Sequence, residues 1–157
     1  MRKVGFWTAA LCGLIGAVPS LAAGGGQVPI PERARGAARV VVATVADTTA
    51  RYERNEFGDA LIVTYAALQV EETVKGPAGP ATVAVEGGTV NGITMRVSSL
   101  PALAKGERAV FFLTPGRQGE FRPHLRGQGI LKLDAQNKVA NSSLTLDEIR
   151  RLAGSAK

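Results

Sequence analysis

Short segments rich in β-branched residues recur along this 157-residue chain, and glycine, proline or charged turn residues separate them. Segments of this length at regular spacing are typical of all-β sandwiches and barrels. We therefore predict an all-β fold of about seven strands. The predicted strands are residues 39–45, 60–74, 81–86, 93–97, 109–115, 119–125 and 130–133, with residues 138–140 as an extension of the last.

Two of these segments have apolar residues on both phases of an extended chain. In residues 60–74 the apolar phase changes after Tyr65 and resumes from Leu68. A strand that coils around a small barrel, or that carries a bulge, can bury both sets. A helix competes for this segment, but its Ile-Val-Thr-Tyr run favours extended chain. Residues 109–115 are apolar on both phases throughout, which predicts a strand buried on both faces.

The end of the chain has helical periodicity. Thr145 is expected to cap a helix with Glu148 three residues later, which is a capping-box pattern. The helix has one apolar stripe, made of Leu146, Ile149, Leu152 and Ala153. The regular strand spacing, the coiled second strand and this closing helix predict an OB-type Greek-key barrel with a C-terminal α-helix over residues 38–157.

The first 22 residues have the order of an export signal. Two basic residues precede an uncharged apolar run over residues 4–18, and small residues at Ser20 and Ala22 form a cleavage site. We predict cleavage after Ala22, with Ala23 as the alternative, and an exported protein that is periplasmic or extracellular. The competing interpretation is a permanent anchor, but the run is shorter than the ~20 residues that span a bilayer. Residues 23–37, rich in glycine and proline, are predicted to be a flexible lead-in.

Residue types limit the chemistry of the mature chain. Its single cysteine, Cys12, lies in the signal, so no disulfide or thiolate metal site is expected after cleavage. A single histidine, His124, provides too few ligands for the usual zinc sites. We also expect no cofactor. Glu71 and Glu72 are adjacent in a predicted strand, so their side chains diverge and do not form a catalytic pair without a bulge. A hydrolase would need His124 in catalysis; we expect a non-catalytic protein.

The size and distribution of the net charge do not indicate a nucleic-acid-binding protein. The formal charge of +6 becomes +4 once the two basic residues of the signal are removed. The basic residues are scattered and few aromatic residues stand between them, so we do not expect binding to nucleic acid. A solvated basic surface and attraction to anionic polymers of the cell envelope are the two interpretations of this charge.

Two loops are the candidate binding surfaces of the predicted barrel. Residues 51–59 form a charged loop, and residues 86–92 contain three glycines and an asparagine, which fits a hairpin connection. A phosphate-binding glycine loop would need a helix after Gly92, and no helical pattern follows. The predicted binding surface consists of Arg51, Arg54, Asn91, Arg122, His124 and Arg126.

Four short motifs occur in a fixed order along the chain. They are VVVATV at residues 40–45, VEETVKG at 70–76, LAKGERAVFFL at 103–113 and LTLDE at 144–148. Together they resemble the netrin-like (NTR) module, the OB-type barrel of the tissue inhibitors of metalloproteinases. In that family a first apolar strand, a long strand ending in a Lys-Gly turn, an apolar strand led by Leu-x-x-Gly and a terminal helix recur in this order. The motifs are also similar to those of uncharacterised exported bacterial proteins.

The resemblance implies an OB-type fold over residues 38–153 and raises metalloprotease inhibition as an alternative function. Inhibitors of that family chelate zinc through an N-terminal cysteine that disulfides hold rigid. The expected mature start here is Ala-Gly-Gly-Gly, and a flexible terminus loses ~1–2 kcal/mol of backbone freedom per residue fixed. We therefore expect weak or no inhibition through this terminus. The expected function is an exported binding module whose partner is a protein or another envelope component.

Overall fold

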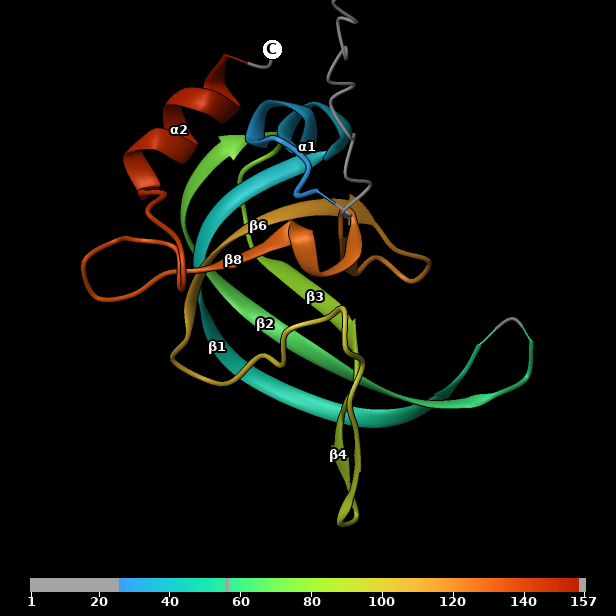
Figure 1. The fold of residues 1–157 in the computed structure, drawn as a ribbon. Helices are drawn as coiled ribbons and strands as arrows, with labels where there is room; N and C mark the ends of the chain where they lie inside the picture. The colour runs from blue at the N-terminus through green and yellow to red at the C-terminus, as the bar shows by residue number, and fades with distance from the viewer. Residues whose placement is uncertain (1–25, 56, 156–157) are drawn as a thin grey trace, which may run out of the picture.

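The computed structural model describes residues 26–55 and 57–155, so the predicted signal peptide over residues 1–22 lies outside the described residues. The described chain is mostly β-strand, as the sequence predicts, with short helices at both ends (Figure 1). The elements in chain order are α1 (Ile30–Gly36), β1 (Arg39–Arg54), β2 (Ala60–Lys75), β3 (Ala81–Glu86), β4 (Gly88–Val90), β5 (Ile93–Met95), β6 (Arg108–Pro115), β7 (Phe121–Pro123), the 3₁₀-helix η1 (Arg126–Gly129), β8 (Ile130–Lys132) and α2 (Leu146–Gly154).

Six strands form one sheet that nearly closes into a barrel. Their order is β1-β2-β3-β7-β6-β8, and β1 also pairs with β6, so five strands complete a ring. All neighbours are antiparallel except β3 and β7, which are parallel and share one register pair, Val83 with Phe121. The ring is therefore weakest at this junction. Strands β4 and β5 form a separate hairpin that projects below the barrel in Figure 1.

Strands β1 and β2 are the longest elements, and both coil around the barrel. Each has 16 residues, and their register shifts at three places, one of which leaves Glu71 without a partner residue on β1. Such bulges bend a strand and increase its twist. The predicted long, irregular strand over residues 60–74 is confirmed. The charged segment 51–59 is only partly a loop, because β1 continues to Arg54, which pairs with Ala60 of β2.

The barrel wall separates two hydrophobic cores. Val41 and Phe111 point into the barrel interior, whereas Val40 and Phe112, their neighbours in the chain, pack beneath the two helices. All four side chains are fully buried. The prediction that residues 109–115 are buried on both faces is thus confirmed, and the apolar residues on both phases of β6 are explained by burial against two different layers.

Helix α1 corrects the prediction of a flexible lead-in over residues 23–37 for the part from Ile30 to Gly36. Ile30 and Ala34 are buried in the outer core, and the buried Arg33 donates to the Gln128 carbonyl oxygen over 2.8 Å. The Lys75 ammonium group donates to the carbonyl oxygens of Ala34 and Ala37, each over 2.7 Å, which satisfies acceptors at the end of the helix. A helix of seven residues is too short to show an apolar period, so these long-range contacts decide its structure.

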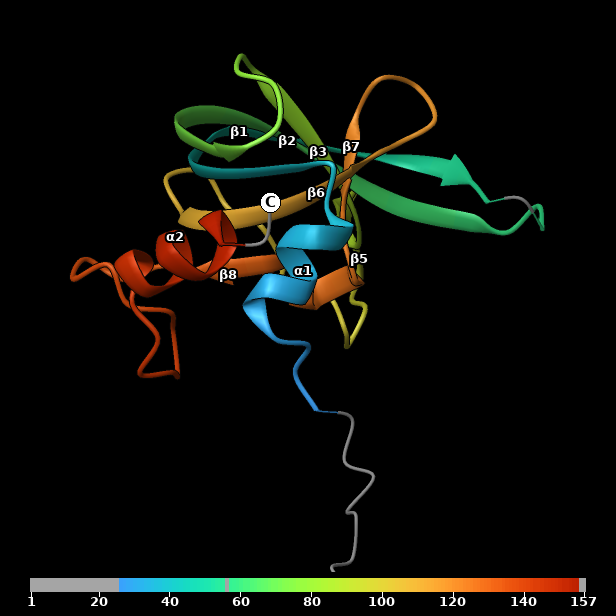
Figure 2. The ribbon, with the colours of Figure 1, turned by 90° about the horizontal axis from the view of Figure 1, so that it is seen from above.

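Helix α2 is formed as predicted. The Thr145 side chain accepts a hydrogen bond from the Glu148 backbone N–H, and the Glu148 carboxylate accepts the N–H of Thr145, which completes the capping box. Its apolar side packs beside α1 on the outer face of the barrel (Figure 2). Within residues 26–55 and 57–155, no helix has the length and hydrophobicity needed to cross a membrane.

Candidate functional site

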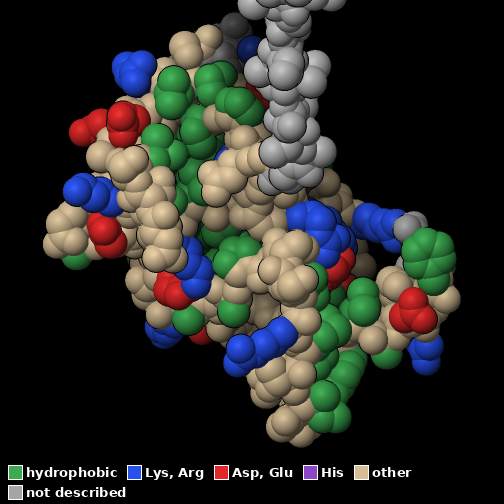
Figure 3. Space-filling view, viewed as in Figure 1, with side chains coloured by type: hydrophobic (Ala, Val, Ile, Leu, Met, Phe, Trp, Pro, Cys, Tyr) green, Lys and Arg blue, Asp and Glu red, His purple; other side chains and the backbone are tan. Residues whose placement is uncertain are grey.

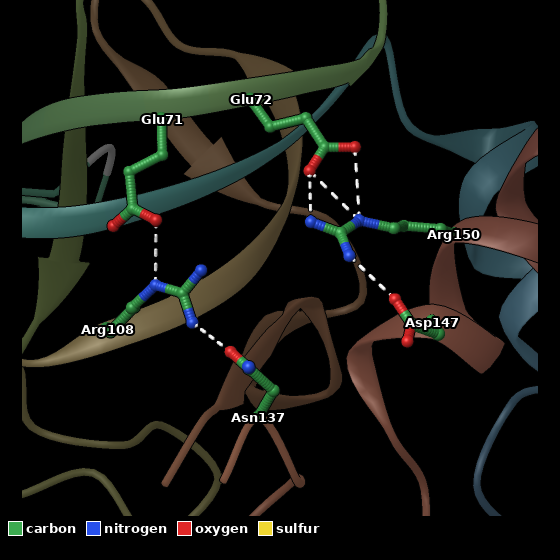
Figure 4. A network of polar contacts seen from close by, with 6 residues as sticks. All are labelled: Glu71, Glu72, Arg108, Asn137, Asp147 and Arg150. Carbon is green, nitrogen blue, oxygen red and sulfur yellow. Dashed lines mark hydrogen bonds and ion pairs between the residues drawn. The ribbon is translucent and has the colours of Figure 1, made fainter. Parts of the chain in front are cut away.

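Polar residues of the motifs at residues 70–76, 103–113 and 144–148 join strands to one another and to α2. Arg108 of β6 pairs with Glu71 of β2 over 2.7 Å and also contacts Asn137, while Glu72 pairs with Arg150 of α2 over 2.6 Å (Figure 4). A β-bulge falls at Glu71, but the two carboxylates bind different arginines. Each carboxylate therefore forms a separate ion pair that joins β2 to another element.

The turn residues of the same motifs hold the segment that precedes β6 in place. Gly106 has a φ of +86°, and its N–H donates to the Val45 carbonyl oxygen over 2.8 Å. The Glu107 carboxylate accepts the Ala104 N–H over 2.9 Å and pairs with Lys132 over 2.7 Å. The Gly-Glu-Arg sequence therefore positions the start of β6 against β1, β2 and β8. The polar and turn residues of these motifs are therefore engaged in contacts within the fold.

A cleft of about 400 Å³ lies between the β1–β2 turn and the β6–β7 loop. Its floor is the face of β2 that carries Leu61, Val63 and Tyr65, and Glu53 of β1 lies opposite Leu61. Alternate residues of paired strands share one face of a sheet, so these side chains point the same way. We call this the arginine cleft. It is lined by Glu53, Arg54, Asn55, Phe57, Leu61, Val63, Tyr65, Glu86, Arg117, Gln118, Glu120 and Arg122.

One wall of the arginine cleft is a bonded group of three side chains. The Arg51 guanidinium lies over the Tyr65 ring, 4.2 Å from its centroid, and its Nε donates to Glu53 over 2.9 Å. The Tyr65 hydroxyl donates to the same carboxylate. The hydrogen bond from Tyr65, followed by that from Arg51, lowers the pKa of Glu53. Glu53 is therefore ionised at neutral pH, and the contacts with Arg51 and Tyr65 hold it in position.

The opposite wall is organised by the buried carboxylate of Glu120. It accepts the backbone N–H of Gln118 over 2.8 Å and that of Arg117 over 3.2 Å, and Arg122 lies 3.6 Å away. Burial alone would raise the pKa of Glu120, but the backbone hydrogen bonds and the Arg122 charge outweigh it, so the pKa is lowered. The β6–β7 loop is thus held in one conformation by an ionised side chain.

The six predicted binding residues do not form one surface. Arg54 and Arg122 line the arginine cleft, Arg51 lies at its edge, and Arg126 borders it through an ion pair with Glu86 of 3.2 Å. The other two lie elsewhere: Asn91 is at the turn of the β4–β5 hairpin, with a φ of +49°, and His124 packs against α1. The predicted surface omits Glu53, Tyr65, Arg117, Gln118 and Glu120. The alternation of residues 61, 63 and 65 indicates that they share one face, but not which residues of other segments lie against that face.

His124 has a structural environment. A Cβ atom added at Gly36 would lie 2.4 Å from its Nε2, so the imidazole fills the space beside the end of α1. Burial, and then the nearby charge of Lys75, lower the pKa of His124. Protonation of this histidine therefore opposes folding.

We expect the free energy of unfolding to fall as the pH is lowered from 7.5 to 5.5. The unfolded histidine, with a pKa of about 6.5, takes up a proton before the folded one does. The stability that the neutral histidine contributes above the unfolded pKa is therefore lost as the pH falls toward the lower pKa of the folded state. Urea unfolding at both pH values measures the change, and His124→Gln should reduce it. An equal pH dependence in the variant would show that another group is responsible.

No protein-family model matches this chain, and no curated protein matches it. Figure 3 shows Lys and Arg side chains beside Asp and Glu side chains on the face in view. Among the described residues, no group of three or more His, Cys, Asp or Glu side chains is placed to hold a metal ion. The cleft offers guanidinium groups, which bind carboxylate and phosphate oxygens in pairs.

Proposed function

We propose that this protein is an exported, non-catalytic binding module with a barrel of OB type. The order β6-β1-β2-β3 fits a Greek key, in which a fourth strand returns beside the first, and the OB barrel has five strands. OB barrels bind ligands on the face of their second and third strands and in the loops after the first and fourth. The arginine cleft has the equivalent position, between the β1–β2 turn and the β6–β7 loop.

The ligand that we infer is an acidic polysaccharide of the cell envelope. The carrying observation is the charge of the described residues at the arginine cleft: five arginines line or border it, against three lining carboxylates. Each of these carboxylates already has an arginine partner, Glu53 with Arg51, Glu86 with Arg126 and Glu120 with Arg122. Asp59 in the adjacent turn accepts a hydrogen bond from Asn55 and adds a fourth carboxylate, so the arginines still exceed the described carboxylates by one. The described residues at the cleft therefore keep a net positive charge, which attracts an acidic ligand, and the open cleft accommodates an extended chain.

The absence of catalysis is part of the proposal. A general acid or base works best when its pKa lies near the pH of the reaction. The pKa values of Glu53 and Glu120 are instead lowered by the groups that bind them. Both carboxylates are therefore weak bases, and each accepts hydrogen bonds from arginine, tyrosine or backbone donors, which supports a role in shaping the cleft.

Titration calorimetry with an oligogalacturonate tests this proposal, and neutral maltoheptaose is the control. We expect saturable binding of the acidic oligosaccharide alone, with an affinity that falls roughly tenfold between 50 and 200 mM salt. The decrease follows from screening of two or three guanidinium–carboxylate contacts. Equal binding of maltoheptaose, or an affinity independent of salt, would contradict an acidic-polymer site; the second result would favour a protein partner.

A further inference from the structure

We infer that a second site, beneath the β4–β5 hairpin, binds a small apolar carboxylate. This hairpin pocket has a volume of about 470 Å³, which lies in the range of small-molecule sites. It opens between β3, the hairpin and the segment over residues 96–103. The inference stands apart from the proposed function, because its ligand is not a polymer and its site is a different cavity.

The floor of the hairpin pocket is continuous with the interior of the barrel. Val85 and Leu103 line it and belong to the buried inner core, and Leu100 packs against the same core. Met95 and Val97 add apolar surface from the hairpin side. Ligand sites occur in the mouths of β-barrels, where apolar walls bind the body of a ligand and a few polar groups orient it.

The roof of the pocket is held in place by close backbone contact. The Thr64 hydroxyl donates to the Gly87 carbonyl oxygen over 2.7 Å. Gly88 follows with a φ of +136°, and a Cβ there would lie 2.4 Å from the Thr64 Oγ1. Only glycine allows the hairpin to lie this close to β2. The cavity therefore exists before a ligand binds, which limits the loss of conformational entropy on binding.

The polar rim leaves one positive charge for a ligand. The Thr89 and Thr94 hydroxyls are bonded to each other over 2.8 Å, and Glu86 is paired with Arg126. Arg96 lines the same pocket and is exposed, and no described residue forms a hydrogen bond or ion pair with it. A guanidinium group above an apolar floor fits a monoanion with an apolar body, so the ligand class is a medium-chain carboxylate.

Calorimetric titration of the purified protein with octanoate tests the inference, with octanol and acetate as probes of the two halves of the ligand. We expect saturable octanoate binding, at least about tenfold weaker binding of octanol, and no measurable binding of acetate. Arg96→Gln should weaken octanoate binding about tenfold, as expected for the loss of one charge-assisted contact. Ala102→Trp, at an exposed lining position, should block the cavity. Arg35→Gln on α1 removes the same charge elsewhere and should bind as the unaltered protein does.

Thermal unfolding of each variant establishes that it is folded. If octanoate does not saturate the protein, or if Arg96→Gln or Ala102→Trp binds it as tightly as the unaltered chain, the inference is wrong. None of these substitutions changes a residue that lines the arginine cleft, so a failure here is separate from a failure of polysaccharide binding.

Discussion

Replacement of Gly76 by alanine is expected to reduce the free energy of unfolding by about 3 kcal/mol. Gly76 has a φ of +84°, and an added Cβ would lie 2.6 Å from the Ala38 carbonyl oxygen. This backbone is not free to move away, because the Ala38 N–H donates to the Leu113 carbonyl oxygen over 2.8 Å. The Lys-Gly turn is therefore required where β2 ends beside the start of β1.

Gly106→Ala is the matched control for this prediction. Gly106 has a φ of +86°, but nothing lies within 4 Å of the added Cβ, so the substitution adds backbone strain without a clash. We expect it to cost about 1–2 kcal/mol, clearly less than Gly76→Ala. Urea unfolding of the two variants measures the difference. Equal losses would show that the close approach of the two strands at Gly76 contributes nothing.

The second large effect is expected for the double variant Arg51→Gln/Arg122→Gln, which should weaken oligogalacturonate binding about 100-fold. Each charge-assisted hydrogen bond contributes roughly 1.5–3 kcal/mol, and a loss of 1.4 kcal/mol is a tenfold change in affinity. The fold should persist, because Tyr65 still donates to Glu53 and backbone N–H groups still bind Glu120. Calorimetric titration at low salt provides the measurement.

A control for this variant must have the same net charge. Arg35→Gln/Arg151→Gln removes two positive charges from exposed positions on α1 and α2, away from the arginine cleft. We expect it to bind within about twofold of the unaltered protein, since distant exposed charges are screened. If both double variants lose the same affinity, binding depends on overall charge and the cleft has no specific role.

The sequence predicts those parts of the fold that local patterns determine. The bounds of β3 and the capping box of α2 follow from glycine and proline positions and from a four-residue motif. The apolar residues on both phases of β6 likewise predict its burial on two faces. In each case the residues that carry the signal are neighbours in the chain.

The candidate site could not be predicted in the same way, because its walls come from distant segments. Tyr65 meets Glu53 across a strand pair, and the β6–β7 loop that holds Glu120 is more than fifty residues further along the chain. Arg126 joins the border of the cleft only through Glu86. Periodicity identifies the face of β2 that carries Leu61, Val63 and Tyr65, but not the loops that cover it. The predicted surface includes His124, but its packing against Gly36 depends on α1, which is too short to show an apolar period.

Amide chemical-shift mapping of the ¹⁵N-labelled protein during an oligogalacturonate titration tests the central claim most directly. A ligand in the arginine cleft should shift the amides of the β1–β2 turn, the adjoining residues of β2 and the β6–β7 loop, in a saturable manner. The amides of α2, on the outer face of the barrel, should not shift. Saturable shifts confined to the helices or the β4–β5 hairpin, or no saturable shifts at low salt, would contradict the assignment of the arginine cleft as the binding site.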